Sequence, residues 1–348
     1  MLPIRHLRVQ NIRSHQDYTV AITEGVTVIT GPNGSGKTSL LEALYIALQG
    51  TSFKGSDSDA LRKDAPWWRI DITTAQDGVR TVTFDPARTT KRKQFTIDDT
   101  VIARLGVKHK YPVVLFEPDD LRLLHGSPAR RRSFIDRFIS QLNPLYATAV
   151  RKYERALKQR NNLLKRDYVR EDELFAWDIA LAEHGAYMID QRIAFIEALN
   201  KQLTDAYNDI AHSHDDITIH YSHTFVGDVK QKLLSELYAH REKDGYLGVT
   251  TVGPHRHDIM FSINNSPAIA TASRGEARTI MLALKFLEVG IIEEVTGLKP
   301  LILLDDVFSE LDVSRQQALS SRTKEHQIVM TSTHVVSSDR SFTHIELS

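Results

Sequence analysis

One short segment, GPNGSGKT at Gly31–Thr38, limits what this 348-residue chain can fold into. It lies between the apolar run Val26–Ile29 and a segment whose apolar residues, from Leu40 to Leu48, recur at helical spacing. This context predicts a strand, a glycine-rich loop and a helix in succession. Because glycine tolerates backbone angles closed to other residues, such a loop can surround a phosphate with amide groups at the positive end of the helix. The segment therefore predicts a nucleoside triphosphate site in an α/β fold.

Individual residues near this loop have expected roles. Lys37 would reach the β and γ phosphates, and the Thr38 hydroxyl would hold Mg²⁺. Arg13 lies in a polar stretch between two predicted strands, from which it would reach a base or a phosphate, and a solvated turn is the alternative. The expected ATP ligands from the loop and the residue after it are Gly31, Pro32, Asn33, Gly34, Ser35, Gly36, Lys37, Thr38 and Ser39.

Two carboxylates near the C-terminus extend the predicted site. Leu301–Leu304 has the pattern of a buried strand and is followed by Asp305 and Asp306. Since α/β sheets bind ligands at the carboxyl ends of their strands, we expect Asp305 to orient Mg²⁺ or its waters opposite Thr38. Asp306 is expected to position the attacking water or to accept its proton. A single aspartate that begins a helix would explain one carboxylate here, but not two.

His334 is the third member of the predicted catalytic group, with Asp306 and Lys37. The apolar run Ile328–Met330 predicts a second strand that leads into TSTH, and His334 ends this motif. A histidine at the end of that strand could hydrogen-bond a γ-phosphate, whereas the alternative is a surface histidine.

A second helix N-terminus predicts an anion site. Ser273, Arg274, Gly275 and Glu276 open an apolar helical segment, and a serine followed by a glutamate three residues later forms a capping box. The same helix start would bind an anion. The phosphate loop already surrounds one side of a triphosphate. We therefore expect this second helix start to contact a nucleotide that is bound by another copy of the chain. The pattern predicts a dimer closed by ATP.

The rest of the chain divides into a head and an arm. The head is expected at 1–120 and 248–348, and the arm at 121–247. The head contains three short β-like runs that predict an antiparallel β meander. These runs are Trp68–Ile72, Val79–Phe84 and Gln94–Ile97. A further hairpin is expected from Gly248 to Ile263, with the turn that contains His255 raised off the sheet.

The arm is expected to be a short antiparallel helical hairpin. Apolar residues between 142 and 210 follow a heptad pattern in two halves, interrupted by Arg160 and Asn200. Residues 151–170 hold eight Lys/Arg and two Asp/Glu, whereas 171–216 hold two and eleven. Much of the basic face of the first helix is expected to neutralise its acidic partner helix, with each exposed pair contributing only ~0.5 kcal/mol.

Total charge does not indicate a polyanionic partner, because 44 Lys and Arg balance 44 Asp and Glu. Any DNA contact must therefore come from a local patch, and a solvated charged surface is the alternative at each candidate. The candidates are Lys91, Arg92, Lys93, Arg130, Arg131, Arg132, His255 and Arg256.

Composition excludes some classes of protein. The sequence has no cysteine, so disulfides, thiolate metal sites and cysteine nucleophiles are absent. The first ten residues carry charges without the apolar core of a signal peptide, and no apolar run reaches the ~18 residues of a membrane span. These features favour a cytoplasmic protein.

Four motifs together resemble ATPases of the ABC type. GPNGSGKT, SRGEART, LILLDDVFSELD and TSTH follow one another as phosphate loop, signature, acidic strand and switch histidine. Two further segments, FEPDDLRLLHGSPARRRSFID and TVGPHRHD, and the short helical arm resemble the RecF family of DNA replication and repair proteins, which is related to the structural-maintenance-of-chromosomes family. The resemblance covers nearly the full length of the chain.

This resemblance implies an ABC-type P-loop ATPase head with ATP and Mg²⁺ as cofactors. It implies a homodimer that forms with ATP on double-stranded DNA, at gaps or at single-stranded junctions. It also implies weak ATP hydrolysis that releases the dimer, and cooperation with RecR and RecO in loading recombinase during recombinational repair and replication.

Several residues refine the resemblance. Asp306 stands where many ABC ATPases carry glutamate, which implies slow hydrolysis. Arg274 and Glu276 depart from the LSGGQ signature of transporters, and Glu117 occupies the place of the glutamine in the lid loop. The segment SELD, which ends at Asp312, resembles the loop that connects the two sites across the dimer, so Asp312 joins the expected ATP contacts.

Three other classes fit the sequence less well. The ATPase subunit of a membrane transporter would have an LSGGQ-like signature and a much shorter separation than the 268 positions from Lys37 to Asp305. A small-molecule kinase would leave the Ser273–Glu276 motif unexplained. A GTPase would need an NKxD element after the phosphate loop, and none follows in a usable place.

Overall fold

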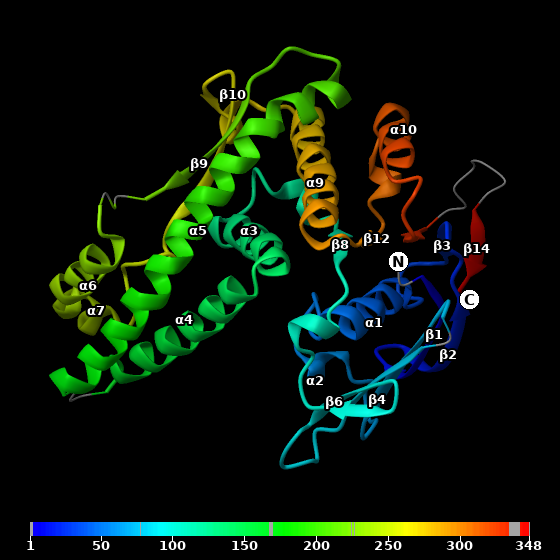
Figure 1. Ribbon diagram of the computed structural model, residues 1–348, viewed down its shortest axis with the longest axis horizontal. Helices are drawn as coiled ribbons and strands as arrows, with labels where there is room; N and C mark the ends of the chain where they lie inside the picture. The colour runs from blue at the N-terminus through cyan, green and yellow to red at the C-terminus, as the bar shows by residue number, and fades with distance from the viewer. Residues whose placement is uncertain are drawn as a thin grey trace. The chain divides into compact units, whose positions relative to one another are not determined.

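The computed structural model describes residues 3–76, 78–166, 170–223, 225, 227–333 and 342–347. The chain forms two compact units, of which unit 1 comprises Met1–Asp120 and Glu288–Ser348 and unit 2 comprises Leu121–Leu287 (Figure 1). The sequence predicts 248–287 in the head, but these residues belong to unit 2. The reason is a non-local pairing, because the strand at Asp258–Ile263 pairs with a strand of the arm.

Unit 1 contains a five-stranded sheet in the order β14-β3-β13-β12-β8, in which every neighbouring pair is parallel. Four of its strands are apolar runs buried almost throughout, as parallel strands usually are. The strands predicted from sequence at Val26–Ile29, Leu301–Leu304 and Ile328–Met330 are confirmed. The strands are β3 (Val26–Thr30), β8 (Val113–Phe116), β12 (Leu301–Leu304), β13 (Ile328–Ser332) and β14 (Thr343–Glu346). The sheet brings the phosphate loop and the two aspartates to one edge.

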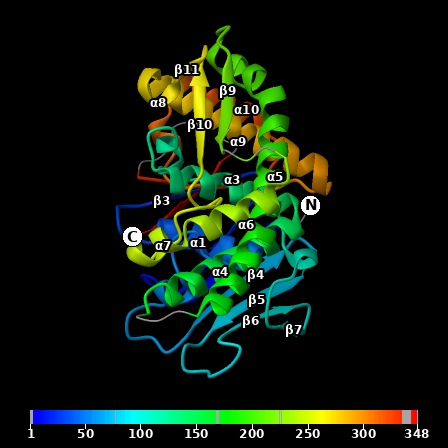
Figure 2. The same ribbon diagram turned by 90° about the vertical axis from the view of Figure 1, so that its left-hand side faces the viewer.

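Unit 1 also contains a six-stranded antiparallel sheet in the order β2-β1-β4-β5-β6-β7, of which Figure 2 labels β4, β5, β6 and β7. The three strands of the predicted meander, β4, β5 and β6, lie side by side in it, and their alternating burial shows that one face packs inward. The strands are β1 (Ile4–Ile12), β2 (His15–Ala21), β4 (Trp68–Thr74), β5 (Val79–Phe84), β6 (Lys93–Ile97) and β7 (Thr100–Ile102).

Helix α1 (Lys37–Gln49) occupies the core of unit 1. Every residue from Leu40 to Gln49 is buried, and apolar residues of α1 and of both sheets form one hydrophobic cluster. A helix that is apolar on all sides needs such a position. The rigid packing of α1 fixes the loop at its N-terminus. The other helical segments described in unit 1 are α2 (Asp57–Ala60), α10 (Val313–Arg322), the part of α9 (Arg274–Thr296) from Glu288 onward, and the 3₁₀ turns Val107–His109 and Phe308–Glu310.

Unit 2 combines helices with a small antiparallel sheet of order β11-β10-β9. Its helices are α3 (Pro128–Leu142), α4 (Pro144–Leu163), α5 (Glu171–Ala211), α6 (Val229–Ala239), α7 (Arg241–Leu247) and α8 (Ala268–Thr271), with a 3₁₀ turn at Asp120–Arg122 and the start of α9 (Arg274–Thr296). The strands are β9 (Ile217–Ser222), β10 (Asp258–Ile263) and β11 (Ser266–Pro267). The hairpin expected from Gly248 is wrong: β10 pairs with β9, and 248–257 form turns.

Helices α4 and α5 run antiparallel, side by side (Figure 1). Arg160, near the end of α4, bonds Asp178, near the start of α5, at 2.7 Å, and Arg192 further along α5 reaches the Tyr146 hydroxyl at the start of α4. Residues 167–169, which lie between the two helices in the sequence, are outside the described residues.

The two polar residues that interrupt the heptads have buried partners. Arg160 is fully buried and also pairs with Asp244 at 2.7 Å, and it donates to the Thr250 hydroxyl. Asn200 exchanges two hydrogen bonds with the backbone of Ile219 in β9. Buried polar groups are stable only when paired, so these residues hold the segments after α5 against the hairpin.

Candidate active site

The phosphate loop has the backbone geometry that its sequence predicts. Gly34 and Gly36 adopt φ values of 87° and 96°, and Gly36 is the N-cap of α1. A Cβ atom on Gly36 would lie 2.3 Å from His15 Nε2 and 2.4 Å from Ser14 Oγ. Both the left-handed conformation and the lack of space therefore require glycine at this position. Backbone amides at the start of α1 are consequently available at the helix N-terminus.

Lys37 and Ser35 direct polar groups into the loop. The Lys37 side chain is buried, and its Nζ donates to the carbonyl oxygens of Gly31 at 2.9 Å and Pro32 at 3.1 Å. Ser35 Oγ is buried and has no hydrogen-bond partner among the described residues. Because buried polar atoms are rarely left unpaired, this hydroxyl fits a ligand with acceptor oxygens. A phosphate group has such oxygens and the charge that Lys37 complements.

Thr38 and Asp305 come together as predicted. Thr38 Oγ1 donates to Asp305 Oδ1 at 2.7 Å, although 267 positions separate the two residues. Strand β13 lies between β3 and β12, and Thr331 near its end donates to the same carboxylate oxygen at 3.1 Å. Lys54 Nζ lies 3.6 Å from Asp305 Oδ2. The site therefore offers hydroxyl and carboxylate oxygens, the ligand types that suit Mg²⁺.

Side chains alone would not complete the coordination of a metal ion beside Thr38 and Asp305. The described part of the chain has no group of three or more His, Cys, Asp or Glu side chains that could hold a metal ion. A cation beside Thr38 and Asp305 would thus need further oxygens from a nucleotide and from water, which is the usual coordination of Mg²⁺ in ATPases.

Asp306 has the conformation and chemistry of a functional residue. Its φ of 52° is unusual for a residue other than glycine, and its amide donates to the Thr331 hydroxyl at 2.8 Å. Burial raises the pKa of the Asp306 carboxyl above its ordinary value, while Lys37 opposes this shift and Asp305 adds to it. A carboxylate with a raised pKa is a better proton acceptor, so Asp306 is suited to assist an attacking water.

The predicted roles of His334 and Arg13 in nucleotide contact are not tested by the described residues. His334 lies outside the described residues, so its role stays a prediction. The Arg13 guanidinium forms two bonds of 3.0 Å to the buried carboxylate of Glu42 on α1, which also accepts from Ser52. Arg13 thus braces the helix behind the phosphate loop, and contact with ATP stays a prediction for it.

The Ser273–Glu276 capping box is present at the start of α9. Ser273 N donates to the Glu276 carboxylate at 2.7 Å, and Glu276 N donates to Ser273 Oγ at 3.2 Å. Ser273 is exposed, and its hydroxyl proton can still donate to a further acceptor. At the start of α10, Asp312 caps the helix by accepting from Arg315 N at 3.0 Å. Both helix starts are therefore ordered by their own side chains.

Two of the arginines predicted to contact DNA have structural roles in unit 2. Arg131 is buried and pairs with Asp258 at 2.8 Å, and it also donates to the Gly126 carbonyl. Arg132 donates to the His257 carbonyl at 2.6 Å. Burial and pairing make Arg131 a poor DNA contact, contrary to the prediction. Arg130 is half-buried and stays a candidate.

The 255–257 turn is also not the exposed basic loop that was predicted. Burial lowers the pKa of His255 to about 4, so this ring is neutral at pH 7. Its two nitrogens bond the Tyr153 hydroxyl at 2.7 Å and the Thr250 carbonyl at 3.1 Å. Arg256 is exposed, but its guanidinium is held on the same Thr250 carbonyl. The turn is fixed by α4 and by its own backbone.

The last group of DNA candidates follows β5. Lys93 pairs with Asp57 at 2.5 Å, and Arg92 donates to the Arg88 carbonyl at 3.1 Å. Lys91 and Arg92 are exposed. These two residues keep accessible charge, whereas Lys93 is committed to its ion pair.

Lys54 and Thr331 belong to the site but were not predicted. Lys54 lies in a polar loop that resembles any solvated loop in sequence. Thr331 belongs to the TSTH motif, and its position at the carboxyl end of a buried strand next to β12 is the signal that could have identified it.

Together, the phosphate loop after β3, the acidic end of β12 and the parallel sheet that joins them define a P-loop ATPase head of the ABC type. The AAA domain family model matches residues 6–211. The DNA replication and repair protein RecF of Clostridium perfringens is 32% identical over 338 residues, covering 95% of this chain and 93% of that protein. RecF of Streptococcus suis is 35% identical and covers 95% and 92%. The chain belongs to the RecF family.

Solved structures agree with this assignment. A structure of the recombination mediator protein RecF with ATP, in the RecFOR pathway, superposes with a TM-score of 0.85 at 29% identity and covers 97% of this chain and 94% of that one. An Smc head bound to the C-terminal winged-helix domain of ScpA superposes with a TM-score of 0.51 at 15% identity, over 96% and 90%, which shows likeness of fold alone. Within the described ranges, no helix is both long and apolar enough to cross a membrane.

Proposed function

We propose that this protein is an ATP-dependent DNA-binding ATPase of recombinational repair and replication. The observation that carries the proposal is the Thr38–Asp305 hydrogen bond of 2.7 Å, which joins the phosphate loop to the acidic strand end. RecF relatives named for replication and repair, and the solved RecF structure with ATP, support ATP as the nucleotide and DNA as the partner.

In this proposal the residues of the site have separate roles in hydrolysis. The loop amides and Lys37 bind the β and γ phosphates. Thr38 and Asp305 would be the protein residues that hold Mg²⁺, which would neutralise charge on the phosphate oxygens. Asp306 orients the attacking water and accepts its proton, and its shorter side chain in place of glutamate makes hydrolysis slow. His334, Arg13 and Asp312 are assigned to nucleotide contact by resemblance to the family.

ATP controls assembly in the same proposal. Ser273 and the start of α9 in one copy bind the triphosphate held by the loop of another copy, so ATP supplies contacts that only the dimer can make. A ligand that binds the dimer better than the monomer shifts the equilibrium toward the dimer. Hydrolysis removes these contacts and releases the dimer. By resemblance, the dimer forms at gapped or junction DNA and works with RecR and RecO in loading recombinase.

The test is sedimentation with a gapped duplex present or absent. With ATP and Mg²⁺, the protein should sediment as a dimer and bind the duplex, and with ADP it should return to monomer. DNA affinity should fall steeply as salt rises, because phosphate contacts release counterions. Lys37→Ala, which removes the phosphate-binding ammonium, is the control and should remain monomeric with ATP. A DNA affinity that changes with neither the bound nucleotide nor the salt concentration would refute the proposed function.

A further inference from the structure

The outer face of α4 carries a row of basic side chains, the basic stripe. It comprises Arg151, Lys152, Arg155 and Lys158 on the helix and Lys165 and Arg166 just after it, and all six are exposed. The opposite face, with Tyr146, Tyr153 and Arg160, is buried in unit 2. At about 100° per residue, Arg151, Arg155 and Lys158 stack on one side of the helix.

The charge of the basic stripe is not cancelled by α5. Among the described residues only Arg166 of the stripe forms an ion pair, at 3.8 Å from Glu173. Acidic Asp178 on α5 is instead committed to buried Arg160 and to Arg241. Helix α4 contains one acidic residue, Glu154. The exposed face of the first hairpin helix is therefore strongly positive, although the whole chain has no net charge.

The dimensions of the basic stripe suit a DNA backbone. From Arg151 to Leu163 the helix rises about 18 Å at 1.5 Å per residue. One strand of B-DNA carries a phosphate every ~3.4 Å of its axis, so about five phosphates lie along this length. Long Arg and Lys side chains on a helix that packs against a second helix can bind successive phosphates along this length.

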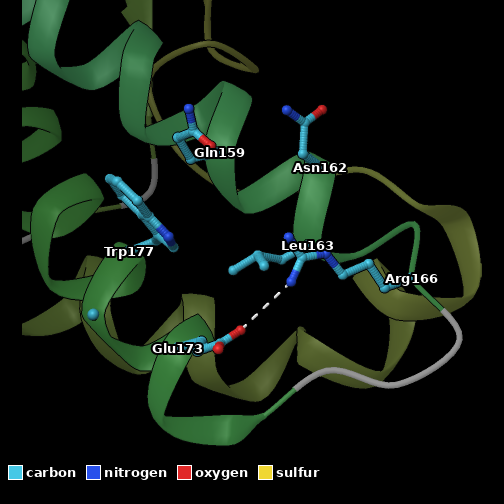
Figure 3. Close-up of a pocket in the computed structure, with 7 residues that line it drawn as sticks. Gln159, Asn162, Leu163, Arg166, Glu173 and Trp177 are labelled. Carbon is cyan, nitrogen blue, oxygen red and sulfur yellow. Dashed lines mark ion pairs between the residues drawn. The ribbon is translucent and has the colours of Figure 1, made fainter.

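The basic stripe ends at a pocket with a different chemistry. A cavity of ≈ 430 Å³ is lined by Gln159, Asn162, Leu163, Arg166, Glu173, Ala176 and Trp177. In Figure 3 the Leu163 side chain points toward the Trp177 indole, the Gln159 amide lies above them, and the Arg166–Glu173 pair closes another side. Trp177 is half-buried against the cluster of Leu163, Leu164 and Leu174, so its ring is held in place. An aromatic face beside an amide is suited to stack on a nucleobase and to hydrogen-bond its edge.

We propose that the basic stripe and this pocket form one DNA site, which rests on the proposed function. The stripe binds the phosphate backbone, and the pocket takes an unpaired base where duplex meets single strand. Arg166 belongs to both features, so backbone and base contacts are adjacent. This would give the hairpin a means of preferring gapped DNA over intact duplex.

The stripe is tested by the triple variant Arg155→Gln, Lys158→Gln, Lys165→Gln with ATP and a gapped duplex. Losing three phosphate contacts should reduce the slope of log affinity against log salt by about 3 and weaken binding by ~10-fold or more at low salt. The matched control is Lys201→Gln, Lys230→Gln, Lys232→Gln, which removes the same charge from exposed positions elsewhere in unit 2. It should bind as the wild type does. An unchanged slope in the first triple variant would overturn the proposal, whereas no DNA binding by the wild type would refute the proposed function instead.

The pocket is tested by comparing gapped with intact duplex. Trp177→Leu keeps an apolar side chain but loses the ring, and it should weaken binding to gapped DNA by ~5- to 100-fold with little change for intact duplex. Trp177→Phe restores a ring and should recover most of the preference. Matching thermal unfolding of the three proteins shows that the fold is kept. Equal losses on both substrates, or no loss with Trp177→Leu, would contradict a base-binding pocket.

Discussion

Replacing Asp306 with Asn is expected to lower kcat for ATP hydrolysis by about 10²- to 10⁴-fold, because an amide cannot accept the proton of the attacking water. ATP affinity should change little, since Lys37, Thr38 and Asp305 remain. Asn also tolerates the left-handed backbone of this position, where φ is 52°. The variant should therefore hold ATP without turning it over and accumulate as a dimer, measured by single-turnover kinetics and sedimentation.

The pH dependence of the wild type gives an independent check on Asp306. Burial raises the pKa of this carboxyl, with Asp305 adding to the shift and Lys37 opposing it. A raised pKa means that the carboxylate is protonated at a higher pH on acidification than an ordinary aspartate, whose pKa is about 3.9. The acid limb of the kcat profile should lie above that value and be absent from the residual activity of Asp306→Asn. Normal turnover by the variant would remove Asp306 from its proposed role.

Replacing Ser273 with Arg is expected to abolish ATP-dependent dimerisation. The exposed hydroxyl at the tip of α9 would be lost, and a long charged side chain would be forced into the contact with the partner's triphosphate site. A side chain too large for this contact costs ~3 kcal/mol, which is about 100-fold in the dimer Kd, so the dimer is lost at protein concentrations where the wild type only just forms it. ATP binding to the monomer should be nearly unchanged, because the phosphate loop is intact.

Ser273→Thr is the matched control, because threonine keeps both the hydroxyl and the ability to cap the helix. It should dimerise with ATP as the wild type does. Sedimentation velocity and equilibrium nucleotide binding on the same samples separate the two effects. Should Ser273→Arg still dimerise with ATP, the signature helix does not act across the interface.

Motifs that depend on contiguous residues were predictable. The strand–loop–helix around Lys37 and the acidic end of Leu301–Leu304 follow from local patterning, and the parallel order of the strands then brings their carboxyl ends together. The contact between Thr38 and Asp305 can thus be predicted from sequence, because parallel strands place their carboxyl ends at the same edge of a sheet even when they are far apart in the chain.

Features that depend on non-local pairing were not predictable. The boundary of unit 2 follows from the pairing of β10 with β9, and no local pattern marks that partner. The charge of His255 depends on burial against Tyr153, which comes from a helix 102 positions away. Arg131 has the sequence of a surface arginine, yet Asp258 and two backbone carbonyls take up its donors.

We propose that each complete reaction centre needs two copies of the chain. The most direct measurement is the rate of ATP hydrolysis per chain, at saturating ATP and Mg²⁺, over a wide range of protein concentration. If two copies are needed, this rate falls toward zero as dilution separates the dimer and rises to a plateau when the dimer is fully formed. A rate per chain that stays constant over the whole range, in samples that sediment as monomers, would contradict it.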